Sequence, residues 1–237
     1  MTIQEGFTRF HERLDMILNN FGFYFDRSKH EARKGTDRDW CKVIFDIHKM
    51  YDFTYDVPIL LVVRNNQIQS VRGAAKAEKK ETDYTINLRP ASLSTYYYPG
   101  KRNWQIITDP GTKLIGSIIN FEHTASVDNW LEGFSQFMED IGYHFFNRFN
   151  SIDDYDQWFT QTMNNEQQGI HSGLPWNDCC AGVAAAWLNK NPSFENIYNT
   201  WWSIFEQAMS TKSRNDLREL KAFIDSNEVE EWIKGTN

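Results

Sequence analysis

Cysteine is scarce in this chain of 237 residues, and its placement excludes a disulfide framework. The cysteines are Cys41, Cys179 and Cys180. An odd number cannot pair completely, and adjacent cysteines form a disulfide only with strain. The longest apolar run, VPILLVV at 57–63, is far too short to cross a bilayer. The opening residues MTIQEGFTRFHERLD lack a basic region followed by an apolar run, so we expect no signal peptide. These absences predict a cytoplasmic protein with reduced cysteines.

The common cofactor and metal motifs are also missing. The sequence contains no Gly-x-Gly-x-x-Gly, no Gly-x-x-x-x-Gly-Lys-Ser/Thr and no Gly-x-Ser-x-Gly. It contains no His-x-x-x-His or Cys-x-x-Cys pair, and its six histidines are scattered. Asp46 with His48, and Asp140 with His144, could each supply two metal ligands, but no third ligand is indicated. We therefore predict no metal and no cofactor.

Positive charge is outweighed by negative charge. The formal net charge is −7 at pH 7 and the sequence pI is about 5.4. Affinity for duplex nucleic acid comes largely from Lys and Arg that displace counterions, so the charge argues against duplex nucleic acid as a partner. An acidic protein is better suited to a basic protein partner, which it attracts electrostatically. The sequence does not fix an oligomeric state.

Aromatic residues, by contrast, are plentiful. They make up 15% of the chain, and hydrophobic residues make up 41%. This is enough apolar surface to offset the entropy of an ordered chain, so we expect a folded core rather than disorder.

The N-terminal part has one helical pattern followed by strand patterns. Its helical stripe ends before Gly22 and consists of Phe7, Phe10, Leu14, Ile17 and Phe21. Apolar side chains alternate in WCKVIFDI (40–47), which predicts a strand with one buried face. PILLVVRNNQIQSVRG (58–73) predicts a β-hairpin that turns at Asn65 and Asn66, because Asn tolerates left-handed backbone. YTINL and WQIITDPGTKLIGSIINF, with a turn at Asp109-Pro110-Gly111, complete the β-rich part.

From residue 126 the apolar spacing becomes helical. Ser126 is expected to cap a long helix, and Ser151–Asp154 has capping-box spacing ahead of a second one. Further helices are expected at roughly 177–189, after Ser193, after a capping box at Ser213–Asp216, and in EVEEWI at 228–233.

Strands that precede helices, rather than alternating with them, predict an α+β fold. We expect an N-terminal helix and antiparallel β-sheet over residues 1–123, followed by a helical region over 124–237 that packs on the first. No linker rich in Pro, Gly or Ser separates the two parts.

Adjacent cysteines at a helix start raise the question of thiol catalysis. The positive end of a helix lowers the pKa of a thiol, and His171 is the nearest candidate base to Cys179 and Cys180. Asp178, however, adds negative charge that disfavours a thiolate. Cys180 also falls on an apolar stripe, where cysteine behaves as a small hydrophobe. We favour a structural role and keep a cysteine-dependent hydrolase or transferase as the alternative.

STYYYPGKRNW, residues 94–104, is the candidate binding segment. It combines aromatic faces with cations, a mixture favoured at protein interfaces and able to hold single-stranded nucleic acid. The candidate binding residues are Tyr96, Tyr97, Tyr98, Lys101 and Arg102. The opposing interpretation is that alternate tyrosines pack on the sheet while Pro99-Gly100 turns the chain.

An amphipathic helix followed by NNFGFYFDRS (19–28) and DWCKVIFDI (39–47) resembles small bacterial families labelled only as domains of unknown function. IGYHFFNRFNSIDDYDQWF (141–159) is similar to their helical tails. The resemblance covers about half of the chain and implies an opening helix, a Gly-Phe step and a curved antiparallel sheet. Some comparable α+β proteins are encoded beside polymorphic toxins and act as immunity proteins. The resemblance therefore implies a binding function and carries over no catalytic residue.

The sequence favours a non-catalytic cytoplasmic protein that acts by binding a basic protein partner, as a toxin-immunity protein would. The alternatives are the cysteine-dependent enzyme and a protein that binds a small ligand or nucleic acid.

Overall fold

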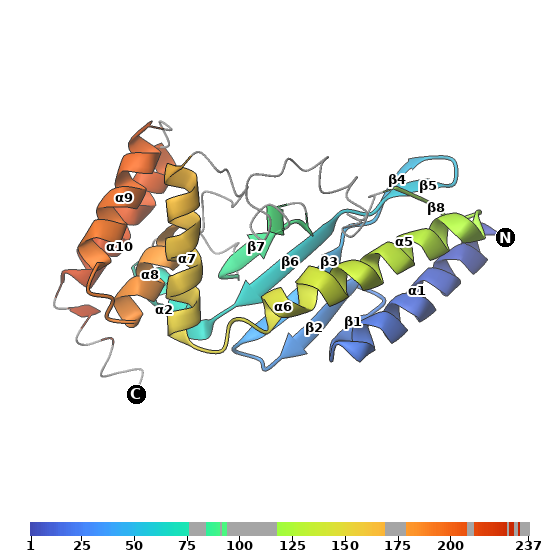
Figure 1. The fold of residues 1–237 in the computed structure, drawn as a ribbon, viewed down its shortest axis with the longest axis horizontal. Coiled ribbons are helices and arrows are strands. Elements are labelled where there is room, and N and C mark those ends of the chain that lie inside the picture. Colours follow the sequence, from blue (N-terminus) through green and yellow to red (C-terminus); the bar gives the residue numbers. More distant parts are fainter. Residues whose placement is uncertain are drawn as a thin grey trace. The chain divides into compact units, whose positions relative to one another are not determined.

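The computed structural model describes residues 1–75, 84–90, 92–93, 118–168, 179–207, 211–226, 228–229 and 232. It confirms the α+β class, with an N-terminal helix, antiparallel sheet and a later helical region (Figure 1). Contacts divide the chain into two compact units. Unit 1 comprises Met1–Val63 and Asn87–Arg148, and unit 2 comprises Arg64–Ile86 and Phe149–Asn237. Each unit is thus built from two separate stretches of chain, with boundaries after residues 63, 86 and 148.

Helix α1 spans Ile3–Asn20. Thr2 caps it in a capping box with Glu5, which satisfies backbone N–H groups that a helix start leaves without partners. The fully buried large side chains of α1 are Phe10, Leu14 and Leu18. The helix ends as expected before Gly22, whose φ of +78° is a left-handed conformation that glycine adopts without strain.

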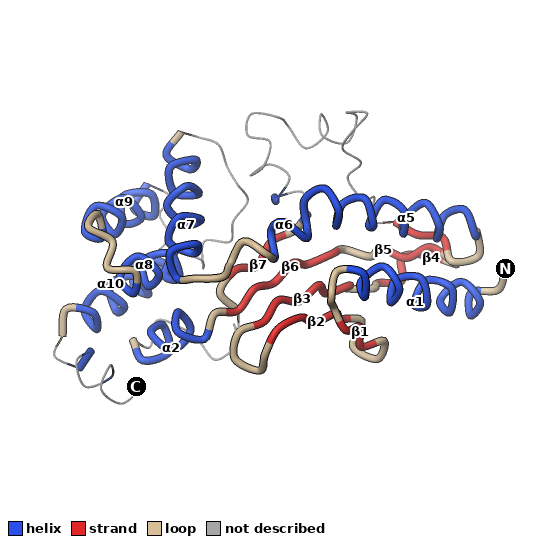
Figure 2. Tube along the Cα trace, turned by 60° about the horizontal axis from the view of Figure 1, so that its bottom comes forward, coloured by secondary structure: helices blue, strands red, loops and turns tan. Residues whose placement is uncertain are grey.

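The larger sheet has five strands in the order β1-β2-β3-β6-β7 (Figure 2). The strands are β1 Tyr24–Asp26, β2 Glu31–Gly35, β3 Trp40–Phe45, β6 Ile59–Arg64 and β7 Ile86–Leu88. The β1–β2 and β2–β3 pairs are antiparallel. The alternation expected in β3 is confirmed, since Val43 and Phe45 are buried. Phe45 packs edge-on against Trp130 and Phe134 of helix α5 (Thr124–Phe137), which covers this face of the sheet beside α1.

A smaller antiparallel sheet has the order β4-β5-β8. Its strands are β4 His48–Tyr51, β5 Thr54–Asp56 and β8 Ile118–Asn120. Tyr55 on β5 packs edge-on against Phe7 of α1 and Phe121, which anchors this sheet to the core of unit 1. All four residues of β4 are exposed.

Helix α5 spans Thr124–Phe137 and begins earlier than the sequence suggested. Its N-cap residue is His123, and no side chain caps it. The Ser126 hydroxyl instead accepts a hydrogen bond from the Asn120 backbone N–H at 2.9 Å, so the assignment of Ser126 as cap is wrong. The helix continues through a π-helical turn, η1 (Met138–Gly142), into α6 (Tyr143–Phe146).

The hairpin expected at Asn65 and Asn66 is also wrong. Strand β6 is followed by helix α2, Asn66–Ala74, and the Asn65 side chain caps that helix by accepting the Ile68 backbone N–H at 3.0 Å. Ile68 and Val71 are fully buried, as expected of side chains three apart on one helix face. The same asparagine chemistry that suits a turn therefore starts a helix here.

Unit 2 is organised around helix α8, Cys179–Leu188. Helices α2, α7 (Ile152–Gln167), α9 (Phe194–Gln207) and α10 (Thr211–Ile224) all contact it. Its first eight residues are buried. A Cβ at Gly182 would lie 2.9 Å from the Phe159 Cβ, so glycine permits the close approach of α7 and α8.

Three expected helix starts in unit 2 have different outcomes. The capping box at Ser151 is confirmed, with Asp154 as its partner, and opens α7. The capping box at Ser213 is wrong: α10 already runs from Thr211, and Ser213 is buried within it. Helix α9 begins at Phe194, directly after Ser193 as expected.

The turn expected at Asp109-Pro110-Gly111 lies outside the described residues. Among the helices that the structure describes, none has the length and apolar character needed to cross a membrane.

Candidate functional site

The binding residues expected from the sequence, Tyr96, Tyr97, Tyr98, Lys101 and Arg102, lie outside the described residues. So does His171, the candidate base. Their roles stay predictions.

Cys179 and Cys180 do lie in the described part of the chain, at the first two positions of α8. Their residues are only 2% and 3% exposed, and their sulfur atoms are 3.9 Å apart. Burial raises the pKa of the third thiol, Cys41, to about 11. A thiol must be reachable by substrate and be deprotonated to act as a nucleophile. The burial of the pair favours the structural interpretation.

Neither of the two possible metal-ligand pairs gains a third ligand among the described residues. Asp46 Oδ2 lies 2.8 Å from His48 Nε2, and both side chains are well exposed. Asp140 accepts a hydrogen bond from Gln136 at 3.0 Å. Across the described residues, no three His, Cys, Asp or Glu side chains gather as a metal-binding group.

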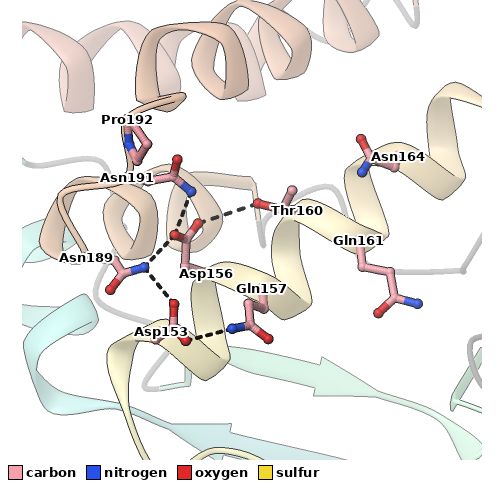
Figure 3. Close-up of a pocket in the computed structure, with 9 residues that line it drawn as sticks. All are labelled: Asp153, Asp156, Gln157, Thr160, Gln161, Asn164, Asn189, Asn191 and Pro192. Atoms are coloured by element: carbon pink, nitrogen blue, oxygen red, sulfur yellow. Dashed lines mark hydrogen bonds between the residues drawn. The ribbon is translucent and has the colours of Figure 1, made fainter.

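The described part of unit 2 has a polar cavity of about 440 Å³ beside helix α7 (Figure 3). One wall consists of α7 side chains, and the other is the turn between α8 and α9. The lining residues are Asp153, Asp156, Gln157, Thr160, Gln161 and Asn164 from α7, and Asn189, Asn191 and Pro192 from the turn.

Local sequence explains how α7 presents this wall. The capping box at Ser151 fixes the start of the helix. Polar side chains then recur at intervals of three and four residues and so share one face of the helix. They are Asp153, Asp156, Gln157, Thr160 and Asn164. The opposite face carries Tyr155, Trp158, Phe159 and Met163, which are buried in the unit. The helix is amphipathic, and its polar face borders the cavity.

The second wall depends on how α8 ends. Lys190 follows the helix with φ of +53°, a left-handed conformation that ends the helix, and the backbone N–H groups of Lys190 and Asn191 donate back to carbonyls of α8. This turn places Asn189 and Asn191 on either side of Lys190 with both side-chain amides directed at α7 (Figure 3).

Asp156 is the centre of the site and is only 2% exposed. Its Oδ2 accepts hydrogen bonds from Asn189 Nδ2 at 2.8 Å and Asn191 Nδ2 at 2.7 Å, and its Oδ1 accepts a longer one from Thr160 at 3.4 Å. Asn189 Nδ2 also donates to Asp153 Oδ1 at 3.0 Å, so one amide bridges two carboxylates. Gln157 donates to the other oxygen of Asp153 at 2.6 Å.

The charged side chains of this lining are all acidic. Its nine residues, all in the described part of the chain, include two carboxylates, five side-chain amides and one hydroxyl, but no lysine or arginine. The bonded donors of the two carboxylates are amides and a hydroxyl, which carry no full positive charge. The cavity therefore attracts cationic and hydrogen-bond-donating groups.

Sequence reasoning did not find this site. The pattern at Ser151–Asp154 predicts a capping box, which is correct for Asp154, but it does not point to Asp156 or to the Asn-Lys-Asn turn. The available signal was the spacing of Asp153, Asp156 and Thr160 along one helix face. The pairing of that face with residues 189–191 is a tertiary contact that spacing alone does not reveal.

Comparison with known proteins adds no further residues to the site. No family model, curated protein or solved structure matches this chain. The candidate function is therefore argued from the chemistry of the described residues.

Proposed function

We propose that this is a cytoplasmic, non-catalytic protein that acts by binding a basic protein partner, as an immunity-type inhibitor binds a toxin. The observation that carries the proposal is the cavity in unit 2, where Asp153 and Asp156 share an amide donor and none of the nine lining side chains is a lysine or arginine. A lysine or arginine side chain of the partner would supply the missing cation.

The burial of Asp156 strengthens this attraction. A charge at the wall of a cavity is screened less than one in open solvent, so a cation that enters gains more Coulomb energy than at an exposed site. Asn189 and Asn191 hold the carboxylate in place before binding, and a preorganised acceptor loses little entropy when the partner docks. The net charge of −7 adds long-range attraction for a basic protein.

The cysteine-dependent hydrolase or transferase is less well supported. Cys179 and Cys180 line the interior of unit 2 and are 2% and 3% exposed. A binding role relies on the carboxylates and amides that line the cavity, and it requires no activated thiol.

The test is affinity capture from an extract of the source cells with the purified chain, followed by titration calorimetry with the captured protein. We expect a protein with excess Lys and Arg whose binding weakens as salt rises. Asp153→Asn keeps the shape of the side chain but removes one carboxylate at the cavity rim, and should raise the Kd about tenfold. Glu219→Gln is the matched control. It removes an exposed carboxylate from α10, outside the cavity lining, and should leave the Kd unchanged.

Circular dichroism of Asp153→Asn checks that α7 is still formed, because an acidic residue in the first turn also stabilises a helix. Capture of no basic protein overturns the proposal. Equal affinity of the Asp153→Asn variant and the unaltered chain removes the cavity from it.

A further inference from the structure

Exposed apolar side chains concentrate on the smaller sheet of unit 1. Among the described residues, seven large apolar side chains are at least 40% exposed, and four of them belong to β4, its turn into β5, and β8. These four, here called the hairpin surface, are Met50 (51% exposed), Tyr51 (62%), Phe53 (40%) and Ile118 (55%). Single exposed apolar residues are ordinary, but a contiguous group marks an interaction site.

Strand register explains why this group is not part of the core. Tyr51 lies opposite Thr54 on β5, and Ile118 lies opposite Asp56, two residues further along the same strand. Residues two apart share a face, so Tyr51 and Ile118 project to the same side of the sheet. Tyr55 and Ile119 form the alternate row, and that row packs against the core through Phe7 and Phe121. The Tyr51–Ile118 side is the outer face.

Strand addition at the β4 edge is disfavoured. The register between β4 and β5 shifts between Lys49 and Tyr51, which leaves Met50 as an extra residue in β4. Such a bulge twists an edge strand, and a lysine in its middle is a second common device against strand pairing. A partner of this surface would therefore be recognised through side chains.

The charge around the hairpin surface selects the kind of partner. Residues 46–56 contain three aspartates, Asp46, Asp52 and Asp56, against one lysine, Lys49, which gives a formal net charge of −2. Asp46 Oδ2 also lies 2.8 Å from His48 Nε2. A second copy of the chain would bring the same negative charge to a two-fold contact, in which each patch meets itself. A basic partner would instead meet opposite charge at the rim.

We propose that the hairpin surface docks an apolar patch of the protein partner that is rimmed by lysine and arginine. This inference rests on the proposed function, because it assigns a second contact to the same basic partner. The four side chains together expose on the order of 400 Å² of apolar area, which is about half of one side of a standard interface. The strand register places Tyr51 and Ile118 on one face, and Met50 and Phe53 belong to the same hairpin as Tyr51. The acidic residues around this surface, Asp46, Asp52 and Asp56, would supply the rest of the contact with the partner.

Two designed amphipathic helical peptides test the proposal without the natural partner. They have the same leucine pattern, with lysine at every polar position in one and glutamate in the other. With methyl-labelled protein, the Leu–Lys peptide should shift the NMR signals of the Met50 and Ile118 methyl groups, and the Leu–Glu peptide should not. Tyr51→Ser should weaken Leu–Lys binding about tenfold, because aromatic side chains dominate such contacts. Asp52→Asn should weaken it about threefold.

Tyr24→Ser is the matched control, since Tyr24 is 75% exposed on β1 of the larger sheet. It should bind the Leu–Lys peptide as the unaltered chain does. Equal shifts with both peptides, or an unchanged affinity in Tyr51→Ser, overturn the proposal. Sedimentation that shows a dimer dissociated by Tyr51→Ser also overturns it, because the surface would then belong to a second copy.

The natural partner separates this inference from the proposed function. Loss of its binding in Tyr51→Ser supports the hairpin surface. If a basic partner is captured and Asp153→Asn weakens it while Tyr51→Ser does not, the proposed function stands and the hairpin surface fails. If no basic partner is captured, the proposed function fails even where the peptides bind.

Discussion

His11 should make the stability of unit 1 depend on pH between 6.5 and about 4. Its imidazole lies on α1 among Phe7, Phe10 and Phe25 and stacks on His30 with 5.3 Å between ring centroids. Its Nε2 is buried without a hydrogen-bond partner. Burial, followed by the positive charges of His30 and Arg27, lowers the pKa of His11 to about 4.

The direction of the effect follows from proton binding. Between pH 6.5 and about 4 the unfolded chain protonates His11 while the folded chain resists it, so unfolding takes up a proton and is favoured as pH falls. The stability that neutral His11 provides is complete above pH 6.5 and is lost as pH falls toward 4. The lowered pKa corresponds to about 3 kcal/mol for a fully buried group. Because the ring is only half-buried, solvent screening reduces the expected loss to about 1–2 kcal/mol.

Urea unfolding of the unaltered chain and of His11→Gln, measured at pH 7 and pH 4.5, tests this expectation. Glutamine does not titrate, so the variant should lose about 1–2 kcal/mol less stability over this interval. His144→Gln removes an exposed histidine from α6 and should behave as the unaltered chain does. An NMR titration reads the pKa of His11 directly. Parallel loss of stability in the unaltered chain and His11→Gln, or an imidazole signal that titrates near 6.5, would refute the reasoning.

Three further predictions concern the packing of α1, the hydrogen bonds of Asp156 and the reactivity of the buried thiols. A Cβ at Gly6 would lie 1.9 Å from the Phe121 carbonyl oxygen, so Gly6→Ala should destabilise unit 1 by about 3 kcal/mol in urea unfolding; Gly133→Ala, whose Cβ meets nothing within 4 Å, should be neutral or stabilising by up to about 1 kcal/mol. Asp156→Ala should cost about 2–4 kcal/mol in thermal unfolding of unit 2, because the Asn189 and Asn191 amides lose a charged acceptor; a loss below about 0.5 kcal/mol would contradict a structural role. At pH 7 a thiol reagent should label Cys179 and Cys180 slowly in the native chain and quickly in urea, whereas rapid native labelling would revive the cysteine-dependent enzyme.

Local sequence patterns predict some elements of this chain correctly and others wrongly. The capping box at Ser151 and the alternation in β3 involve residues within a few positions of one another, and both were predicted correctly. At 65–71 two local patterns competed. Asn65 suits a hairpin turn and a helix cap equally well, and the glutamines at 67 and 69 imitate strand alternation. The buried Ile68, Val71 and Ala75 have helical spacing, and their burial in unit 2 decided for the helix.

Ser126 and Ser213 failed for a different reason. Both have the side chain of a good N-cap, but each hydroxyl lies inside a helix that started earlier. At Ser126 the hydroxyl is occupied by the Asn120 backbone N–H at the end of β8. Tertiary contacts thus set the helix start, and a local capping preference worth about 1 kcal/mol does not override them.

Net charge alone could not have located either proposed surface, because many carboxylates are already occupied locally. Glu5 and Asp154 cap their own helices. Asp128 binds Arg9 and Arg13, and Glu31 binds Lys42. These groups contribute to the net charge of −7 but offer little to a cationic partner.

The carboxylates of the cavity and of the hairpin surface differ from these occupied carboxylates in the groups that they contact. In the described structure, Asp153 and Asp156 are held by amides and a hydroxyl. The hairpin carries three carboxylates against Lys49, and one of them, Asp46, also contacts His48. An amide fixes a carboxylate in position without cancelling its charge, whereas an arginine does both. The attraction at contact with a basic partner should therefore come mainly from these few acids, whereas the overall excess acts at long range. Neutralising Asp153 or Asp52 should then reduce binding more than removing the same charge at Glu219.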